Sequence, residues 1–520
     1  MGESGIVRTV DDLTSWHSDW AGLRVAVLGL GVTGFAAADT LVELGAEVLV
    51  AASSAKEQQL GLLSVIGGTF LRHDLATVPD ELVDYNPELI VVSPGFHPDN
   101  ATLLWATEKG VPVWGDIELA WRVRDKVTPV AEWVLVTGTN GKTTTAQLTT
   151  HILEADGKRV AAVGNIGIPV LDAVRYPAGF DVLVVELSSY QLHWMNHTPN
   201  GTISPWASVC LNLADDHIDW HGSRAAYAAA KGRVYTNTKV AAVYNRADDA
   251  TRRMVENAEV IEGCRAIGFG LDAPGPSDFG VVDGILCDRA FLDDRASTAL
   301  ELTTREELAV VGLAAPHSAQ NVLAASALAR SLDVSPSIIR SALQTFTLDS
   351  HRTEHVVTVD EVMWIDDSKA TNPHAAAASL RAFDSVVWIV GGLFKGVDVA
   401  ELVRSYASRL TAAVLIGVDR DSLKSAFARH APTLPLFEVD TADTGEVMPM
   451  AVRLSAAVAR PGDVVLLAPA AASMDQFTDY ADRGTRFASA VHAHLNITTV
   501  DDTTQEGDAD DQSSSAIPQD

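Results

Sequence analysis

Short runs of consecutive apolar residues alternate along the chain with longer alanine-rich stretches of helical character. The runs are apolar at nearly every position rather than at every second one, which is typical of strands in a parallel sheet that helices cover on both faces. Examples are Arg24–Leu28, Glu47–Ala51, Leu89–Val92, Trp133–Val136, Val182–Val185, Val386–Val390, Ala413–Ile416 and Val464–Leu467. The pattern therefore predicts an α/β protein with mostly parallel sheets.

Two breaks in this alternation indicate domain boundaries. One is the charged segment at residues 122–130, and the other lies near residues 347–352. A chain of 520 residues is long enough for roughly three domains. We therefore expect an N-terminal domain, a central domain and a C-terminal domain at residues 1–120, 121–348 and 349–498. The last segment, residues 499–520, is acidic and lacks Lys and Arg, which predicts a disordered tail.

Composition narrows the class of protein further. The formal net charge of −30 disfavours nonspecific binding to nucleic acid or to an anionic membrane. The N-terminus lacks the basic and apolar regions of a secretory signal, and no stretch reaches the about 18 apolar residues of a membrane span. The three cysteines have no metal-ligand or redox spacing. We expect a cytoplasmic protein without disulfides that inserts into no membrane and binds no nucleic acid.

A glycine loop, Gly138-Thr-Asn-Gly-Lys142, follows the apolar run Trp133–Val136. The first N–H groups of the helix that comes next lack intrahelical partners, and the helix dipole adds positive charge, so the loop can cradle phosphate. Lys142 can reach the β- and γ-phosphates of a nucleotide, and the Thr143 hydroxyl can ligate Mg²⁺. Val136 stands where the usual motif has its first glycine, so a chance glycine-rich turn stays open. The motif predicts ATP binding through Gly138, Thr139, Asn140, Gly141, Lys142, Thr143 and Thr144.

A second glycine motif, Gly29-Leu-Gly-Val-Thr-Gly34, follows Arg24–Leu28 and precedes a helix expected at Phe35–Leu44. This is the dinucleotide fingerprint, but residues 50–53 offer no acid for a ribose hydroxyl and no arginine for a 2′-phosphate. An NAD(P) site, a turn needed only for packing and a site for the diphosphate of another nucleotide all remain open. Ser93 and Gly95 end a neighbouring run, at the same carboxyl edge of the sheet, where ligands bind.

Polar residues also follow other runs in the middle of the chain. Glu186 ends Val182–Val185, where an acid beside a phosphate loop can reach Mg²⁺, although a surface glutamate would look the same. His217 lies in a segment richer in polar residues than a turn requires. Lys231, considered by itself, is predicted to be a solvent-exposed lysine on a helix. His317 and Asn321 are i,i+4 neighbours near a helix start, where they could meet a base or cap the helix.

Three polar loops follow runs in the last third of the chain. Asp366–Pro373 combines acid, hydroxyl, amine and amide groups, a combination that packing alone does not explain. Gly391–Gly396 contains Lys395, and Ala470–Phe477 contains Ser473. Because the carboxyl-end loops of an open parallel sheet form one crevice, we expect these side chains to share a ligand site.

Taken in chain order, these motifs resemble those of the Mur ligases of bacterial cell-wall synthesis, from about Arg24 to Leu495. The phosphate loop of that family reads G-T/S-N-G-K-T/S and lacks the first glycine, which accounts for Val136. The other matching segments are Gly115–Leu119, Gly164–Gly167, Glu186–Gln191, Asp216-His217, Lys231, Asn321, His351-Arg352, Gly391–Gly396 and Ser473–Phe477. Asp367–Asn372 is similar to the segment of members that add D-glutamate, whereas members that add L-alanine or a diamino acid carry a D-Y-A-H-type segment there.

The resemblance implies an ATP-dependent amide ligase of peptidoglycan precursor synthesis. The carboxylate of UDP-N-acetylmuramoyl-L-alanine would attack the γ-phosphate of ATP and give an acyl phosphate and ADP. The amine of D-glutamate would then attack the acyl phosphate, and the tetrahedral intermediate would expel phosphate. Such phosphoryl transfer needs positioning and charge neutralisation. By resemblance, Lys142 and Arg352 supply the charge, with Mg²⁺ on Thr143 and Glu186.

The resemblance also implies three domain types and their ligands. A Rossmann-like N-terminal domain would bind the UDP-sugar. A central P-loop ATPase-type domain would bind ATP, and a Rossmann-like C-terminal domain would bind the amino acid. Asn321 and Asp367 would contact adenine and ribose. The residues implied for the UDP-sugar are Val32, Thr33, Ser93, Gly95, Asn165 and Ser188. Those implied for D-glutamate are Thr371, Lys395 and Ser473, and Lys369 in the same loop is a further expected substrate contact.

A second Mg²⁺ is implied at His217 and Lys231. An ammonium group would repel the metal, and in the family this lysine is carbamylated, so we expect the same modification of Lys231. Two positions depart from the family: Ala52-Ser53 lacks an acid that often helps to hold uracil, and Ser318 replaces an asparagine often seen near adenine. We expect a monomer.

Three other functions remain as alternatives. The chain could be another amide ligase of the Mur or folylpolyglutamate type, which the identity of the added amino acid would discriminate. It could be a nucleotide-binding scaffold without chemistry, although Lys142, Glu186, His217, Lys231 and Lys369 are all present. A dehydrogenase is disfavoured by the missing acid after the second run.

Overall fold

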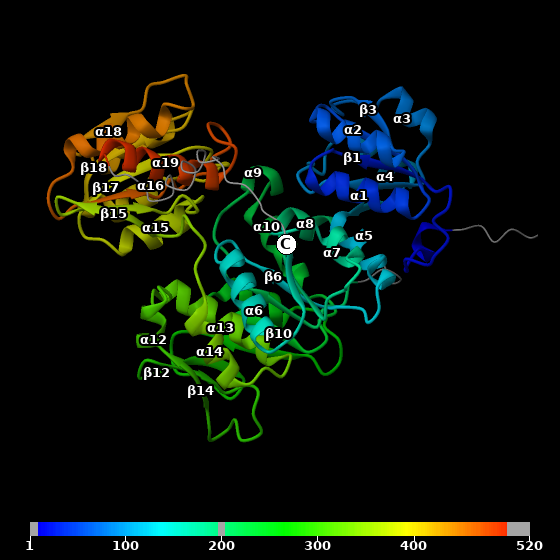
Figure 1. The fold of residues 1–520 in the computed structure, drawn as a ribbon, viewed down its shortest axis with the longest axis horizontal. Helices are drawn as coiled ribbons and strands as arrows, with labels where there is room; N and C mark the ends of the chain where they lie inside the picture. The colour runs from blue at the N-terminus through cyan, green and yellow to red at the C-terminus, as the bar shows by residue number, and fades with distance from the viewer. Residues whose placement is uncertain (1–8, 196–202, 497–520) are drawn as a thin grey trace, which may run out of the picture. The chain divides into compact units, whose positions relative to one another are not determined.

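The computed structural model describes residues 9–195 and 203–496, and the predicted acidic tail at residues 499–520 lies outside them. Three sheets, each covered by helices, make up the described chain (Figure 1). They divide between two compact units that meet in the sequence at Asp349 and Ser350, with two sheets in the first unit and one in the second. The α/β class with three mostly parallel sheets is confirmed, whereas the limits of the domains stay predictions.

The N-terminal sheet is parallel throughout, with strand order β3-β2-β1-β4-β5. Its strands are β1 (Arg24–Leu28), β2 (Glu47–Ala52), β3 (Thr69–Arg72), β4 (Leu89–Val92) and β5 (Val113–Gly115). Its helices are α1 (Val32–Glu43), α2 (Glu57–Ile66), α3 (Asp80–Tyr85), α4 (Ala101–Lys109) and α5 (Asp116–Arg122). The strand order reverses between β1 and β4, which is where such sheets bind ligands.

The glycine turn after β1 leads directly into α1, which begins at Val32 rather than at Phe35. A Cβ on Gly34 would lie 2.0 Å from the carbonyl oxygen of Gly29, so α1 can approach the turn only with glycine at this position. Packing therefore explains the third glycine of the motif, and Val32 and Thr33 become the first turn of the helix.

The central sheet has the strand order β14-β13-β12-β11-β10-β9-β6-β8-β7. Its pairs are parallel except between β12 and β13 and between β13 and β14, which are antiparallel. The strands are β6 (Glu132–Thr137), β7 (Val160–Gly164), β8 (Val182–Glu186), β9 (Ala207–Cys210), β10 (Ala241–Asn245), β11 (Arg265–Phe269), β12 (Asp278–Val282), β13 (Ile285–Asp288) and β14 (Leu300–Thr304). The helices are α6 (Lys142–Ala155), α7 (Val170–Arg175), α8 (Ser189–Trp194), α9 (Ile218–His221), α10 (Arg224–Gly232), α11 (Asp249–Glu256), α12 (Arg305–Val310), α13 (Pro316–Arg330) and α14 (Pro336–Thr345).

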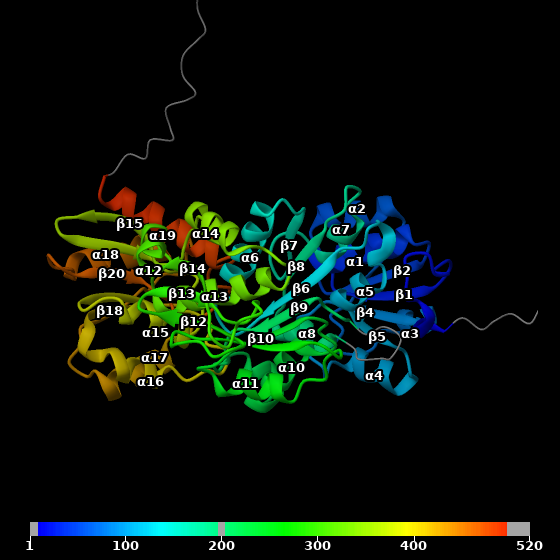
Figure 2. The same ribbon diagram turned by 90° about the horizontal axis from the view of Figure 1, so that it is seen from below.

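One hydrophobic core runs from the first sheet into the second, which is why the two belong to one unit. Trp121 of α5 packs edge-on against Trp133 of β6, with ring centroids 5.2 Å apart. On the same helix, Glu118 and Arg122 form a fully buried ion pair at 2.9 Å. The helix α5 is therefore anchored on both sides, and Figure 2 shows it beside α1 and α7.

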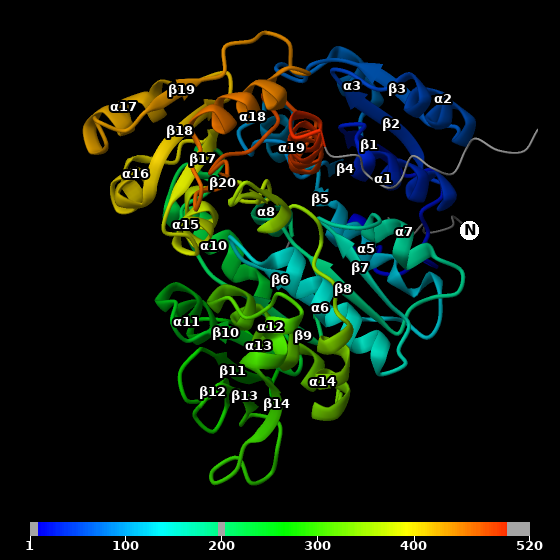
Figure 3. The same cartoon turned by 60° about the vertical axis from the view of Figure 1, so that its left-hand side comes forward.

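The C-terminal sheet, in the second unit, has the order β15-β16-β20-β17-β18-β19. Figure 3 labels β17, β18, β19 and β20 of this sheet. Only the β15–β16 pair is antiparallel among its described pairs. The strands are β15 (Glu354–Val359), β16 (Val362–Asp366), β17 (Val386–Gly391), β18 (Leu410–Ile416), β19 (Leu436–Glu438) and β20 (Val464–Leu467). The helices are α15 (Pro373–Arg381), α16 (Ala400–Tyr406), α17 (Asp421–His430), α18 (Val447–Val458) and α19 (Tyr480–His494).

Two further expectations can be compared with the fold. Cys210, Cys264 and Cys287 are all free thiols, as their spacing predicts. Within residues 9–195 and 203–496, none of the helices has both the length and the apolar character that crossing a bilayer requires.

Candidate active site

The loop between β6 and α6 has the backbone geometry of a phosphate cradle. Gly138 and Gly141 adopt positive φ angles of 152° and 83°. A Cβ on Gly141 would lie 2.4 Å from Oδ1 of Asn321, so both its conformation and its surroundings favour glycine. The helix α6 begins at Lys142, directly after the loop, and its first N–H groups have no intrahelical acceptors. This arrangement suits an anion, as the motif predicts.

The loop after β9 holds this cradle in place. The Asn140 N–H donates to Oδ1 of Asn212 at 2.9 Å, and Nδ2 of Asn212 donates to the carbonyl of Asn140 at 3.0 Å. The hydroxyl of Thr139 accepts from the Ala214 N–H at 3.0 Å and lies 2.9 Å from the hydroxyl of Tyr227. These bonds preorganise the loop, so little reorganisation is needed when a phosphate binds.

Two lysines lie against the cradle. Lys142 donates from Nζ to the carbonyls of Gly138 and Thr139 at 3.0 and 2.9 Å. Lys231 of α10, only 2% exposed, donates to the same Gly138 carbonyl at 2.8 Å. Burial first, and the nearby charge of Lys142 second, lower the pKa of Lys231 to about 7. A substantial fraction of its amine is therefore uncharged at neutral pH, which makes it nucleophilic.

Glu186 ends β8 beside the phosphate loop and is almost fully buried. Its Oε1 accepts from Nδ2 of Asn165 at 2.8 Å. Its Oε2 is buried and has no hydrogen-bond partner within the described residues. Leaving a buried carboxylate oxygen without a partner costs free energy, and a cation bound at this atom would remove that cost. Glu186 therefore fits a divalent cation better than it fits a purely structural role.

His217 precedes α9 and has a positive φ of 54°. Its Nδ1 lies 2.5 Å from the hydroxyl of Tyr190, and its Nε2 lies 3.7 Å from the carboxylate of Asp216. The tyrosine orients the imidazole, as polar neighbours do for metal-ligating histidines. An oriented imidazole beside a carboxylate is a donor set that suits a divalent cation.

One cleft of about 400 Å³ connects these groups to the N-terminal sheet. Its walls include Val32 and Thr33 of α1 together with Lys142, His217 and Lys231 of the central part. Four of the six residues predicted for the UDP-sugar line it, namely Val32, Thr33, Asn165 and Ser188. The other two, Ser93 and Gly95, flank the lining residue Pro94.

Asn321, predicted to contact adenine, lies on α13 and is buried against the phosphate loop through Gly141. The helices α13 and α6 pack together, which brings this amide to the loop. Ser318, where the family often has asparagine, is also buried on α13. The structure thus links Asn321 to the loop itself, and its contact with adenine stays a prediction.

In the second unit, the three polar loops lie side by side at the carboxyl edge of the sheet. The Ala470 N–H donates to the carbonyl of Ala370 at 2.9 Å. Leu393 and Ala472 exchange two backbone hydrogen bonds, each of 2.9 Å. Because β16, β20 and β17 are neighbours, the loops that follow them meet. The predicted substrate contacts on these loops are Lys369, Thr371, Lys395 and Ser473.

Buried polar groups fix the shape of the loop after β16. Asp367 accepts from the Thr353 N–H at 3.1 Å and from the hydroxyl of Ser379, and burial raises its pKa to about 6. Arg483 of α19 is fully buried and donates to Oγ and to the carbonyl of Ser368 at 2.9 and 2.8 Å. Lys369 lies 3.5 Å from the ring centroid of Tyr480. The loop is thereby held rigidly, as a binding site requires.

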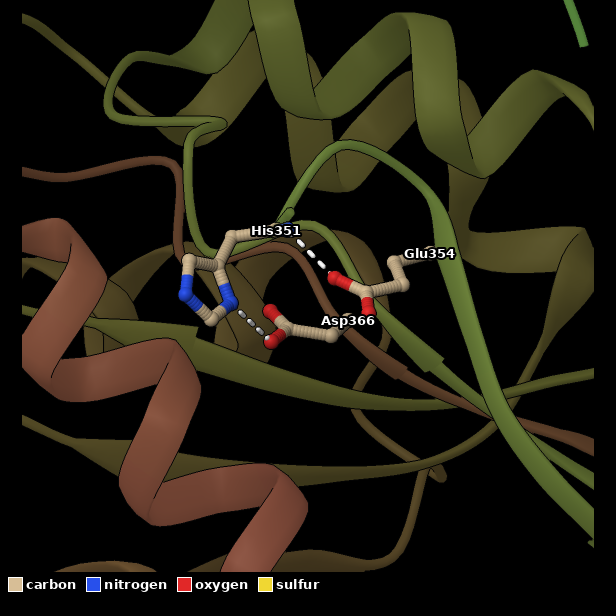
Figure 4. Close-up of side chains that lie close together, drawn as sticks. All are labelled: His351, Glu354 and Asp366. Carbon is tan, nitrogen blue, oxygen red and sulfur yellow. Dashed lines mark hydrogen bonds and ion pairs between the residues drawn. The ribbon is translucent and has the colours of Figure 1, made fainter. Parts of the chain in front are cut away.

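His351 precedes Arg352, the arginine predicted to neutralise phosphate charge, and Figure 4 shows its ring directed at Asp366. Its Nδ1 donates to the Asp366 carboxylate at 2.7 Å, which raises the pKa of His351. The His351 N–H donates to Glu354 at 2.6 Å. These three side chains could hold a metal ion by their spacing, but the ion pair already engages the imidazole and explains the cluster. The pair fixes the backbone beside Arg352.

Sequence reasoning assigned no role to several side chains that shape the site. Asn212 and Tyr227 brace the phosphate loop, Tyr190 orients His217, and Arg483 holds the loop after β16. Asp116 is buried on the wall of the cleft. Asn212, Tyr190 and Asp116 each stand in a segment that matches the family or is dense in polar residues, which is the signal that could have pointed to them.

Two protein-family models and several relatives match this chain. Residues 136–329 match the Mur ligase middle domain, and residues 351–471 match the Mur ligase glutamate ligase domain. A UDP-N-acetylmuramoylalanine–D-glutamate ligase of Leifsonia xyli is 64% identical over 513 residues, which cover 97% of each chain. The protein of the same name from Streptomyces coelicolor is 51% identical and covers 91% of this chain and 98% of its own.

Solved structures share the fold at much lower identity. The UDP-N-acetylmuramate–alanine ligase of Thermotoga maritima has a TM-score of 0.54 and 18% identity. The match covers 91% of this chain and 100% of that one. At this level of identity the likeness concerns the architecture alone.

Proposed function

The chain belongs to the Mur ligase family and is therefore a ligase, and we propose that it joins D-glutamate to UDP-N-acetylmuramoyl-L-alanine with consumption of ATP. A carboxylate oxygen of the alanyl group attacks the γ-phosphorus, and the bond to the ADP oxygen breaks. The amine of D-glutamate then attacks the acyl carbon and loses a proton, and phosphate leaves with that carboxylate oxygen. The product is an amide in a precursor of peptidoglycan.

The cleft described above carries this proposal. It brings residues from the glycine-turn helix α1 and from the phosphate loop to one cavity of about 400 Å³. A nucleotide-linked substrate held at Val32 and Thr33 would extend toward Lys142, where a γ-phosphate would lie. Positioning a carboxylate near that phosphate is the main requirement of the first step.

The residues around the phosphate loop fit ATP and Mg²⁺. The predicted ATP contacts are Gly138, Thr139, Asn140, Gly141, Lys142, Thr143, Thr144, Asn321, Arg352 and Asp367. Thr143 and the partnerless Oε2 of Glu186 would hold one Mg²⁺, and His217 with Lys231 a second. When bound, the cations would neutralise charge on the phosphates. Lys142 and Arg352 would stabilise the charge that develops on the transferred group, as the chain's own contribution.

We propose that Lys231 acts as a carbamate. Its burial, its lowered pKa and the absence of any carboxylate within ion-pair distance among the described residues support this proposal. The neutral amine would attack CO₂, release one proton and leave a negatively charged carbamate. Such a group is an oxygen ligand for Mg²⁺, whereas the ammonium form would repel the metal.

In the second unit, Thr371, Lys395 and Ser473 are the proposed contacts of D-glutamate, and Lys369 is a further proposed substrate contact. The hydrogen bonds between Leu393 and Ala472 support a shared site for Lys395 and Ser473. Lys395 and the hydroxyls of Thr371 and Ser473 match the two carboxylates of D-glutamate in charge and in hydrogen-bonding capacity.

Lys395→Ala is expected to raise KM for D-glutamate by about 10–100-fold, because a charged hydrogen bond is worth about 1.5–3 kcal/mol. KM for ATP should change less than about twofold, since the loop of Lys395 is assigned to the amino acid. Steady-state kinetics with each substrate varied in turn measures both values.

The control for this prediction is Lys424→Ala, which removes a lysine from α17 that pairs with Asp421 on the surface of the same unit. Its kinetic constants should match those of the wild type. Equal increases in KM for ATP and for D-glutamate in Lys395→Ala would remove the assignment of Lys395.

Release of ADP in the presence of UDP-N-acetylmuramoyl-L-alanine tests the proposed function. Release should depend on D-glutamate and should not occur when L-alanine, diaminopimelate or L-lysine replaces it. Turnover with one of these, or with a folate substrate, would point to a different amide ligase. We also propose that the protein is a cytoplasmic monomer.

A further inference from the structure

Asp116 is a buried acid on the wall of the cleft, and the reaction proposed above assigns it no role. It follows β5 directly, begins α5 and is 4% exposed on the cleft wall. Its Oδ2 accepts from Nε2 of Gln191, on α8, at 3.2 Å. Its Oδ1 is buried and has no hydrogen-bond partner in the described part of the chain. Oδ2 is thus paired with Gln191, whereas Oδ1 lacks a hydrogen-bond partner among the described residues, although the backbone N–H groups of Ile117 and Asp116 lower the pKa of this carboxyl group.

A purely structural role does not explain the leftover oxygen. Glu118, two residues further along α5, shows how this helix satisfies a structural acid, because one of its oxygens takes two hydrogen bonds from Arg122. Leaving a buried acceptor unsatisfied costs about 1–3 kcal/mol, and more when the group is charged. Burial raises the pKa of Asp116 to about 6, so the group is still mainly ionised at neutral pH. Oδ1 can therefore accept a hydrogen bond from a ligand in the cleft.

The strand order indicates which part of the substrate supplies that donor. In the order β3-β2-β1-β4-β5, the glycine turn after β1 is central, β2 lies on one side of it, and β5 lies at the opposite edge. A diphosphate at the turn with its nucleoside over β2 directs the other end of the molecule toward β5. In the substrate proposed above, that end is the N-acetylated amino sugar, which carries hydroxyl and amide N–H donors.

We infer that Asp116 is a specificity-determining residue, whose Oδ1 accepts a hydrogen bond from a hydroxyl or amide N–H of the sugar in the UDP-linked substrate. This inference rests on the proposed function for the identity of the substrate. A buried acceptor of this kind discriminates strongly against ligands that lack the donor, because the acceptor is then left unpaired. Asp116 would thus select for the sugar, while the loops after β1 and β4 hold the nucleotide.

Asp116→Asn tests the inference with almost no change in shape. Oε1 of Gln191 is engaged by the N–H and the hydroxyl of Ser188 at 3.1 and 3.2 Å, so Gln191 keeps its Nε2 directed at residue 116. The one oxygen of the asparagine must meet that Nε2, and its amino group then faces the cleft, where a donor meets a donor. Binding of UDP-N-acetylmuramoyl-L-alanine to the full chain, measured calorimetrically without ATP, should weaken by about 10–100-fold.

The same titration with UDP provides the discriminating readout. UDP lacks the N-acetylated amino sugar, so its affinity should be equal in the wild type and in Asp116→Asn. KM for ATP and for D-glutamate should also stay within about twofold of the wild type. Asp116→Glu, which restores the acceptor, should recover part of the lost affinity. Asp84→Asn, at an exposed acid of α3, is the matched control and should behave as the wild type in every assay.

Three results would overturn the inference. They are an unchanged affinity of Asp116→Asn for the sugar nucleotide, an equal loss for UDP and for the sugar nucleotide, and a wild type that binds UDP as tightly as the sugar nucleotide. The last result needs no variant and so decides even if Asp116→Asn does not fold. If the wild type fails to turn over UDP-N-acetylmuramoyl-L-alanine, the proposed function fails. If it turns the substrate over but Asp116→Asn keeps the wild-type KM, only the inference fails.

Discussion

Lys142→Met is expected to lower kcat by about 1000-fold, equivalent to about 4 kcal/mol of transition-state stabilisation. The ammonium group lies at the start of α6, within 3.0 Å of two carbonyls of the phosphate loop. It can therefore reach the phosphates of a nucleotide in the cradle, where negative charge spreads during transfer. Methionine keeps the length of the side chain and removes the charge. The rate of ADP release at saturating substrates measures the effect.

A loss of phosphate stabilisation must be separated from a general loss of structure. Lys109→Ala, at an exposed lysine in the last turn of α4, serves as the control and should keep the wild-type rate. Thermal unfolding of Lys142→Met should resemble that of the wild type, because Lys142 lies on the cleft wall rather than in the core. A variant that keeps more than about a tenth of kcat would contradict the role of Lys142.

Lys231→Ala is expected to lower kcat by about 100–1000-fold, because the variant removes the carbamate proposed to hold the second Mg²⁺. Acetate or formate, as small carboxylates that fit the space left by the side chain, should restore part of the activity. The wild type should gain nothing from either anion. Kinetics over a series of acetate concentrations measures the rescue.

A second readout for Lys231 does not depend on activity. After equilibration with ¹³C-labelled bicarbonate, the wild type should show a carbamate carbon in its NMR spectrum, and Lys231→Ala should not. Lys239→Ala is the matched control, since Lys239 pairs with Glu132 at 3.0 Å and is partly exposed. An inactive Lys231→Ala that no carboxylate rescues, together with a wild-type spectrum without a carbamate signal, would refute the modification.

The strands of the sheets could be predicted closely because burial on both faces leaves a plain signal. The strands β1, β4 and β20 begin and end at the predicted residues. Nearly all residues of these strands are apolar, and the loops that follow them mark where the strands end. No apolar run is given for several other strands, among them β15, which lies at an edge of its sheet and is exposed or partly exposed along its length.

The candidate site was predictable where a local motif performs the chemistry. Lys142 and Thr143 could be read from a loop of a few residues, because phosphate binding uses the backbone of one turn. Groups that act across the fold could not be assigned in this way. Asp116 and Gln191 are 75 residues apart, and their contact exists only because two sheets share one core. The lowered pKa of Lys231 likewise depends on burial, which no spacing of residues reveals.

The path of one oxygen atom tests the central claim, that the phosphate held at Lys142 is passed to a carboxylate that D-glutamate then attacks. The measurement uses UDP-N-acetylmuramoyl-L-alanine labelled with ¹⁸O in both carboxylate oxygens, together with ATP, Mg²⁺ and D-glutamate. Mass spectrometry should find one ¹⁸O atom in the released phosphate and one in the new amide. Unlabelled phosphate formed in step with the amide would contradict the account, because the carboxylate would then never have carried the phosphoryl group.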